Sequence, residues 1–431
     1  MHLGKCRNGR MAALMMVSGP LVACASPSVS TPALPAARTG LAVYEGAVSI
    51  DPSSGSLWAE WSIALVRTAS TRRSVTLLLN DALSISRLSG TGVTDYRVEN
   101  PPDRESDRNR VTIRFAPRAD GDSVTRLNIE YAGAFRTTGD SINSIRGDWV
   151  ELGLDSFWHP VVEGFAQPMT ARVRLSLPAN WTVVTSGVVT DSGDVFVLVN
   201  DVPLVDIAFA ASPSLRYTVG NRSRVYHVDG DPAVIDRVLA TTDRCAEYLD
   251  ARFGSRAPLP SVKVVLAPRD GPGYARKNYV VIAGIVDTAT VPLARFVCHE
   301  VAHYWSSGAV SSGPENWLNE AFAEFVSARY VRASVDDSAY AGIVRQWREQ
   351  GADQPPVWSP GSTTRPNART AYRKAPFLLH RLEERVGTAV MDQILERFMV
   401  EGMRTTPAVL EMIGQVAGPE AADWFEEQLR T

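Results

Sequence analysis

The stretch that decides the fold reads Phe-Val-Cys-His-Glu-Val-Ala-His-Tyr-Trp, residues 296–305. It is apolar except for the pattern His-Glu-x-x-His, and it is compatible with a helix. On a helix, residues i and i+4 lie one turn apart on one face, so His299 and His303 can direct two imidazole nitrogens at one ion. Glu300 then lies beside that ion without having to bind it. The pattern therefore predicts a metal-binding helix.

A second helix is predicted from residue 315 to 330. Its apolar residues recur at helical spacing, so it can pack against the first helix: Leu318, Phe322, Phe325 and Val326. Glu320 and Glu324 lie one turn apart on a shared face. We expect Glu320 to be the third ligand of a single zinc ion that keeps one position open for water. Glu324 either accepts the spare N–H of a ligating histidine or is a solvated surface carboxylate.

This ligand set predicts metal-assisted hydrolysis. Zinc lowers the pKa of a bound water toward about 7 and polarises a carbonyl oxygen. Glu300 would take the proton of that water as general base and later deliver it to the leaving amine. The alternative, a histidine pair that merely decorates an exposed helix, is disfavoured because the chain has only six histidines and this segment is apolar.

The two segments resemble the gluzincin metallopeptidases, specifically the aminopeptidase N family. The matching residues are H-E-V-A-H at 299–303 and W-L-N-E-A-F-A-E at 317–324. The resemblance implies zinc held by His299, His303 and Glu320, and hydrolysis of a peptide or protein substrate. Downstream, Tyr-Arg-Lys-Ala at 372–375 resembles the Y-x-K-G segment of the family, which gives Tyr372 the role of stabilising the transition state.

Three departures from this family bear on specificity. The spacer from His303 to Glu320 is 16 residues, slightly short, although the Ser/Gly-rich run 306–314 can absorb this as a loop. The segment Gly-Tyr-Ala-Arg-Lys-Asn at 273–278 stands where the family has G-x-M-E-N, whose glutamate binds the free amino terminus of the substrate. We interpret Lys277 as the replacement of that glutamate, and a cation cannot pair with an ammonium group.

Lys277 and Asn278 are therefore the predicted substrate-binding positions. Lys277 would face an acidic substrate, or would belong to a solvated edge. The end of the sequence at Thr431 leaves no room for a large helical C-terminal domain, so an open cleft is expected. Aminopeptidase action is the prediction, and endopeptidase or oligopeptidase action is the alternative. A third interpretation is a cell-surface binding lipoprotein with a vestigial zinc site.

The first 24 residues predict the compartment. A basic start and an apolar run at residues 11–22 precede Leu-Val-Ala-Cys at 21–24, which resembles the lipobox of bacterial lipoproteins. We expect residues 1–23 to be a signal peptide, Cys24 to be lipidated, and residues 24–40 to be a flexible tether. The protein would then be extracytoplasmic and membrane-anchored. An ordinary cleaved signal peptide is the alternative, and no later segment approaches transmembrane length.

Cysteine count and charge narrow the partners. Of the four cysteines, Cys245 and Cys298 lie beyond the signal region. An extracytoplasmic location permits a disulfide between them, but Cys298 as a small buried apolar residue is the favoured interpretation. The net charge is −3 and no basic run carries interleaved aromatic residues, so nucleic acid is not expected as a partner.

The expected fold class is α+β with two domains. Alternating strands punctuated by Gly, Asp, Asn and Pro predict an antiparallel sandwich or saddle over residues 41–217. Residues 218–431 are expected to form a thermolysin-like catalytic domain, a small sheet followed by a helical lobe. Expected helices and strands of this domain are 224–228, 232–253, 262–266, 279–282, 339–350, 375–386, 388–399 and 420–429. Arg365, Arg369 and Arg373 would line a substrate groove or form a solvated face.

Overall fold

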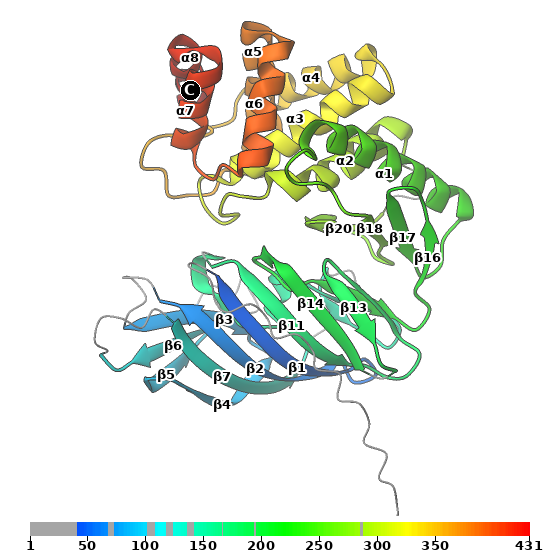
Figure 1. The fold of residues 1–431 in the computed structure, drawn as a ribbon, viewed down its shortest axis with the longest axis vertical. Helices are drawn as coiled ribbons and strands as arrows, with labels where there is room; N and C mark the ends of the chain where they lie inside the picture. The colour runs from blue at the N-terminus through cyan, green and yellow to red at the C-terminus, as the bar shows by residue number, and fades with distance from the viewer. Residues whose placement is uncertain are drawn as a thin grey trace, which may run out of the picture. The chain divides into compact units, whose positions relative to one another are not determined.

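The computed structural model describes residues 41–67, 73–100, 108–117, 124–135, 142–165, 167–193, 195–284 and 288–431. The predicted signal peptide, Cys24 and the tether lie outside these residues. Within them the α+β prediction is confirmed, with a strand-rich first half and a helical second half (Figure 1). No helix of the described segments is both long and apolar enough to cross a membrane.

The largest sheet of the first half has seven strands in the order β13-β14-β11-β1-β2-β7-β4. Their bounds are β1 Ala42–Asp51, β2 Ser56–Val66, β4 Leu83–Gly90, β7 Val124–Ala134, β11 Met169–Ser176, β13 Val188–Asp191 and β14 Val195–Leu204. β1 pairs antiparallel with β2 but parallel with β11. The antiparallel sandwich or saddle expected from the sequence therefore includes one parallel pair. A parallel pair needs a long crossover connection, and the strands between β2 and β11 provide it.

Two four-stranded sheets complete the first half, in the orders β10-β3-β6-β5 and β12-β15-β9-β8. Their bounds are β3 Ser74–Asn80, β5 Val93–Glu99, β6 Arg108–Phe115, β8 Ser144–Ile145, β9 Val150–Leu152, β10 Val161–Val162, β12 Thr182–Thr185 and β15 Phe209–Ser212. Hydrogen bonds join large buried side chains in the core of this half. Trp61 donates to the Tyr131 hydroxyl at 2.7 Å, and that hydroxyl donates to the Trp158 carbonyl at 2.7 Å.

The second half begins with a five-stranded sheet in the order β16-β17-β18-β20-β19. Its strands are β16 Arg216–Val219, β17 Ser223–His227, β18 Val262–Leu266, β19 Tyr274–Arg276 and β20 Tyr279–Ile282. One face of this sheet packs beneath helices α1 and α2, and the other packs against residues of the first half such as Trp149 and Ala208. The predicted domain boundary between residues 217 and 218 falls inside β16.

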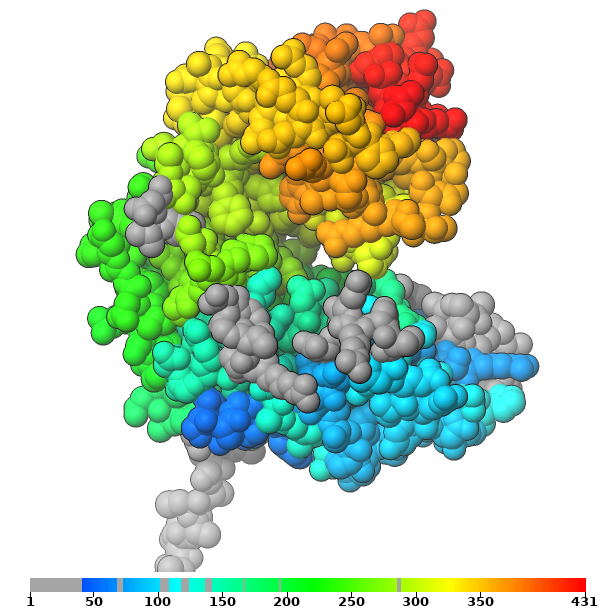
Figure 2. All heavy atoms as spheres, turned by 180° about the vertical axis from the view of Figure 1, so that it is seen from behind, coloured from blue at the N-terminus to red at the C-terminus, as the bar shows by residue number. Residues whose placement is uncertain are grey.

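The helices carry most of the remaining chain. They are α1 Pro232–Phe253, α2 Thr290–Ser306, α3 Asn316–Ser334, α4 Asp337–Gly351, α5 Ala375–Val386, α6 Thr388–Glu401, α7 Thr406–Ala417 and α8 Pro419–Arg430. Residues of α4 to α8, in yellow-orange to red, form one continuous surface in Figure 2. α1 starts where the Asp231 side chain accepts a hydrogen bond from the Ala233 amide at 2.9 Å.

A disulfide joins Cys245 of α1 to Cys298 of α2. Both side chains are fully buried. The interpretation favoured from the sequence, an unpaired and merely apolar Cys298, is wrong. The physical reason is that pairing depends on which faces of α1 and α2 meet, and the two Cα atoms lie 5.6 Å apart once the helices pack. The bridge ties the helix of the His-Glu-x-x-His motif to its neighbour.

Candidate metal centre

The structure brings His299, His303 and Glu320 together. His299 and His303 lie on successive turns of α2, and Glu320 lies on the first turns of α3, which packs against α2. The His299 and His303 Nε2 atoms are 3.1 Å apart. Glu320 Oε2 is 3.5 Å from His299 Nε2 and 3.4 Å from His303 Nε2. Three ligand atoms therefore form a nearly equilateral triangle.

This triangle has the dimensions of a zinc site. Tetrahedral zinc with ligands at about 2.0–2.1 Å places neighbouring ligand atoms about 3.3 Å apart. Glu320 Oε2 is buried and has no hydrogen-bond partner, which is costly for a carboxylate oxygen unless a cation binds it. Burial acts to lower the pKa of His299, but Glu320 and Glu324 outweigh it and raise the pKa to about 10. The donor set and its negative potential both fit a divalent ion.

The Nδ1 atom of each histidine has a partner that orients the ring. His299 Nδ1 lies 3.3 Å from Glu324 Oε2, and His303 Nδ1 lies 3.2 Å from Ser306 Oγ at the end of α2. Both contacts leave Nε2 for the ion, which is the arrangement that carboxylate and hydroxyl partners produce at metal sites. Glu324 is thus buried beside His299 rather than solvated at the surface, as the first of its two predicted roles requires. Ser306 was not predicted, because its distance from His303 becomes meaningful only once the helix is known to end there.

Glu324 is buried, and several donors surround it. Its Oε1 accepts from Arg295 and, at 3.2 Å, from Trp347 Nε1. Arg373 Nη1 adds a contact at 3.4 Å. Burial opposes ionisation, but His299 and Arg295 lower the pKa of Glu324 to about 2. Glu324 is therefore an ionised partner of the His299 ring, and Arg373 contacts it.

Glu300 lies one position after His299 and is 6% exposed. Burial raises the pKa of its carboxyl, and the charges of His299 and His303 act in the opposite direction. A raised pKa is suitable for a group that must take and release a proton near neutral pH. The position and environment of Glu300 thus match the predicted general base.

Tyr372 reaches the same cluster from a different element. It lies in a short π-helix, η3 Thr370–Lys374, directly before α5. Its ring stacks on His299 with centroids 5.6 Å apart. Burial, followed by the charge of Glu320, raises the pKa of Tyr372, so its hydroxyl stays protonated and can donate. π-Helical turns within α-helices occur frequently at functional sites.

The predicted substrate-binding side chains have other partners. Lys277 Nζ donates to the Tyr304 carbonyl at 3.2 Å, and Asn278 Nδ2 donates to the Ser261 carbonyl at 2.8 Å. Both residues form the two-residue turn between β19 and β20, where Lys277 has φ 58°. In the structure both side chains bind backbone carbonyls, and a substrate contact of Lys277 and Asn278 stays a prediction. Counted from Gly273 without a gap, the fourth position of G-x-M-E-N is Arg276, and the charge of Arg276 acts on Glu300.

The short spacer between the two ligand helices is fixed by Asn319. Its side chain accepts from the Ala309 amide at 2.9 Å and donates to the Ala309 carbonyl at 3.0 Å. This pair of bonds holds the loop after α2 against the turn of α3 that carries Glu320. The 16-residue spacer is thus long enough to bring Glu320 to both histidines.

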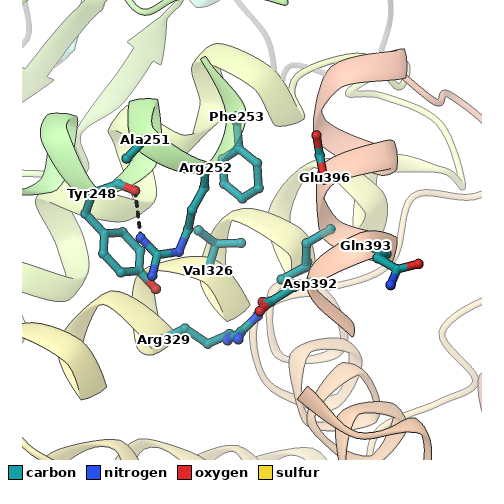
Figure 3. A pocket seen from close by; sticks show the side chains of 10 residues that line it. Tyr248, Ala251, Arg252, Phe253, Val326, Arg329, Asp392, Gln393 and Glu396 are labelled. Atoms are coloured by element: carbon teal, nitrogen blue, oxygen red, sulfur yellow. Dashed lines mark hydrogen bonds and ion pairs between the residues drawn. The ribbon is translucent and has the colours of Figure 1, made fainter. Parts of the chain in front are cut away.

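A separate cavity of about 430 Å³ lies between α1, α3 and α6 (Figure 3). Polar residues on its wall are already engaged with each other. Arg329 pairs with Asp392 at 2.7 Å, and Arg252 donates to the Tyr248 carbonyl at 3.0 Å while covering the Tyr248 ring. The cavity includes none of the residues predicted for the metal centre.

Comparison with solved structures identifies the class of fold. No family model matches the chain, and no curated protein matches it in sequence. An M1 zinc metallopeptidase from Deinococcus radiodurans superposes with a TM-score of 0.69 at 19% identity, covering 90% of this chain and 93% of that one. The expected fold, a β domain followed by a small sheet and a helical lobe, is thereby confirmed.

Two further solved structures are similar. A mutant of the M1 zinc metallopeptidase from Deinococcus radiodurans bound to a Tyr-Ser-Ala substrate has a TM-score of 0.70 at 18% identity, covering 90% of this chain and 94% of that one. Yeast LTA4 hydrolase in complex with Bestatin has a TM-score of 0.70 at 16% identity, covering 90% of this chain and 66% of that chain. The particular fold is that of the M1 zinc metallopeptidases.

Proposed function

We propose that this protein is a zinc-dependent peptidase. The observation that carries the proposal is the triangle of His299 Nε2, His303 Nε2 and Glu320 Oε2. Its edges are 3.1–3.5 Å, and the buried Glu320 Oε2 has no hydrogen-bond partner among the described residues. Zinc held there would lower the pKa of water and polarise the substrate carbonyl. The solved structures with this fold support the proposal, since one of them is bound to a peptide substrate.

The residues of this chain would then handle the protons and the developing charge. Glu300 takes a proton from the attacking water while the new C–O bond forms at the peptide carbonyl carbon. The Tyr372 hydroxyl donates a hydrogen bond to the oxygen that becomes negative. Glu300 returns the proton to the amide nitrogen as the C–N bond breaks, and an amine and a carboxylic acid are released. Glu324 and Ser306 hold the two imidazole rings in position throughout.

Glu300→Gln tests this assignment. The amide cannot act as a base, so kcat should fall by at least about 10²-fold, while bound zinc should remain at the wild-type level. Peptide hydrolysis followed by mass spectrometry and metal content by elemental analysis are the two measurements. Full hydrolysis by a zinc-loaded Glu300→Gln variant would reject the mechanism. Absence of peptide hydrolysis in the zinc-loaded wild-type protein would favour the alternative, a binding lipoprotein with a vestigial site.

Membrane anchoring through Cys24 is part of the proposal. The lipobox-like sequence at residues 21–24 motivates it, and the Cys245–Cys298 disulfide supports an oxidising, extracytoplasmic compartment. Expression of the full chain in a bacterium should place it in the membrane fraction, and Cys24→Ser should release it or block its processing. Mass spectrometry of the mature N-terminus should find a lipid on Cys24; an unmodified N-terminus elsewhere would reject the anchor.

A further inference from the structure

Arg276 occupies a special place beside the proposed catalytic helix. It ends β19, the edge strand of the five-stranded sheet, and β19 packs against α2. Gly273 permits the close approach, because a Cβ there would lie 2.6 Å from the Phe296 ring of α2. Ala275 packs into the cluster that contains Cys298. Lys277, the next residue, donates to the Tyr304 carbonyl of α2 at 3.2 Å, so the end of β19 that carries Arg276 lies beside the part of α2 that carries Glu300 and His303.

The Arg276 guanidinium has hydrogen-bond partners that hold it in place, but they do not use all of its N–H donors. Arg276 Nε donates to Asp206 Oδ2 at 2.7 Å, and Nη1 donates to the Ala275 carbonyl at 2.9 Å. A guanidinium has five N–H donors, so these two bonds leave others for a ligand. The Arg276 side chain is 20% exposed, whereas Asp206 is completely buried. Buried Asp206 therefore fixes the orientation of the Arg276 guanidinium, which remains partly exposed to solvent.

The buried carboxylates of the surrounding elements already have partners. Asp206 binds Arg276 and accepts from the Leu154 amide at 2.9 Å. Glu324 is held by Arg295 and Arg373, and Glu320 belongs to the cluster formed with His299 and His303. Asp155 is exposed, and its negative charge favours the charged form of Arg276.

A second arginine adds to the positive potential. The charge of Arg365 acts on Tyr372, which stacks on His299. Arg365 also faces Asn316 at the start of α3, at 3.2 and 3.3 Å when the amide oxygen of Asn316 points toward the guanidinium. Arg365 therefore lies at the start of α3, the helix that carries Glu320, while Arg276 lies at the end of β19 beside α2.

We propose that Arg276 is a specificity-determining residue that selects peptides without a free α-ammonium group at the reacting end. Like charges repel an ammonium group brought beside the guanidinium, whereas the carbonyl oxygen of an acylated nitrogen accepts a hydrogen bond from it. The substrate class is N-acylated peptides and internal segments of longer chains. The inference rests on the proposed peptidase function and specifies its substrate.

The test compares two quenched fluorogenic peptides of identical sequence, one with a free N-terminus and one N-acetylated, on the zinc-loaded full chain. The wild-type protein should show a kcat/KM at least about tenfold higher for the acetylated peptide. Arg276→Gln should bring this ratio toward one, mainly by raising KM for the acetylated peptide. Mass spectrometry of the products identifies the bond that is cut.

Arg269→Gln is the matched control. Arg269 forms the other buried arginine–carboxylate pair with the first half of the chain, to Glu151 at 2.7 Å, and it lies before β19 rather than at its end. Its loss should lower stability in a thermal melt to a similar extent without changing the ratio of the two kcat/KM values. An equal change of the ratio in both variants would show a general packing effect and overturn the inference.

The remaining outcomes separate the inference from the proposed function. Stepwise removal of residues from the free peptide, with the acetylated peptide resistant, would overturn the selectivity inference and leave the peptidase function intact. Loss of that stepwise activity in Asp155→Asn would then identify Asp155 as the group that binds the amine. Failure of the wild-type protein to cut either peptide or a casein digest, with zinc bound, would instead overturn the peptidase function itself.

Discussion

Tyr372, the predicted oxyanion donor, and the next residue, Arg373, make two separate contacts with the residues around His299. The Tyr372 ring stacks on His299, while Arg373 contacts Glu324, which in turn faces His299 Nδ1. Both contacts pass through the π-helical turn 370–374. The Tyr372 ring is therefore held in the same group of contacts as His299, a predicted metal ligand.

Tyr372→Phe should isolate the contribution of the hydroxyl. Phenylalanine keeps the stacking on His299 but removes the donor, so kcat should fall about 10²–10³-fold. KM and zinc content should change little, because the hydroxyl interacts with charge that develops only in the transition state. Steady-state kinetics on the peptide that the wild-type protein cuts best provide the measurement. A fall in zinc content that accounts for the lost activity would contradict this role.

Glu324→Gln should weaken zinc binding rather than abolish it. The amide is isosteric but no longer carries the charge that strengthens His299 as a ligand, so affinity should fall about 10–100-fold. Competition against a chromophoric chelator measures this change. Glu383→Gln is the control, because Glu383 is also buried and pairs with Arg329 at 3.5 Å outside the metal centre. Equal effects of both substitutions would show that general destabilisation, not ligand orientation, is responsible.

At the residue scale, the sequence predicts contacts between side chains on one face of a helix. It does not predict contacts that depend on how the elements pack or where they end. Spacing alone placed His299 beside His303, and Glu320 beside Glu324. Ser306 was missed, because its contact with His303 depends on where α2 ends. Lys277 is assigned in place of Arg276 when residues 273–278 are compared with G-x-M-E-N so that lysine precedes Asn278; only the structure shows that Arg276 ends β19 and that Lys277, with φ 58°, begins the turn.

At the element scale, periodicity predicted α1, α5, β18 and β20 at the bounds observed, since each carries a clear apolar pattern between breakers. α7 was missed, because Pro407 near its start and Gly414 within it are typical of a loop. Pro407 is tolerated at the first turn, where its missing N–H costs nothing. Pairing between elements, including the β1–β11 pair, could not be derived from the pattern of either strand.

The α1–α2 disulfide should stabilise the folded state by about 2–4 kcal/mol. It closes a loop with a sequence separation of 53, and the loss of that constraint should favour the unfolded chain. Urea unfolding of the double variant Cys245→Ala/Cys298→Ala should show a lower midpoint than the wild-type protein. A reductant should shift the wild-type midpoint in the same direction and leave the variant unchanged. An identical midpoint for reduced and oxidised wild-type protein would show that the bridge contributes nothing.

At the scale of the whole molecule, the five-stranded sheet is covered on both faces. Helices α1 and α2 cover one face with apolar residues, and the other face meets residues of the first half that include buried charges. The sequence predicted a β-rich half followed by a peptidase-like half. It could not predict the contacts between them, because Glu151 and Arg269 are distant in sequence and each alone reads as an exposed residue.

The Glu151–Arg269 pair offers the sharpest test of this contact. Both side chains are buried, with two hydrogen bonds of 2.9 and 2.7 Å between them. Removing one partner leaves the other charge buried and unpaired. Glu151→Leu or Arg269→Met alone should therefore lower the unfolding free energy by about 3–5 kcal/mol. The double variant replaces both charges by apolar groups and should recover much of that loss. Urea unfolding of all four proteins gives the coupling energy. Additive losses would mean that the two charges do not stabilise each other, and the packing of the five-stranded sheet would then depend on its apolar contacts alone.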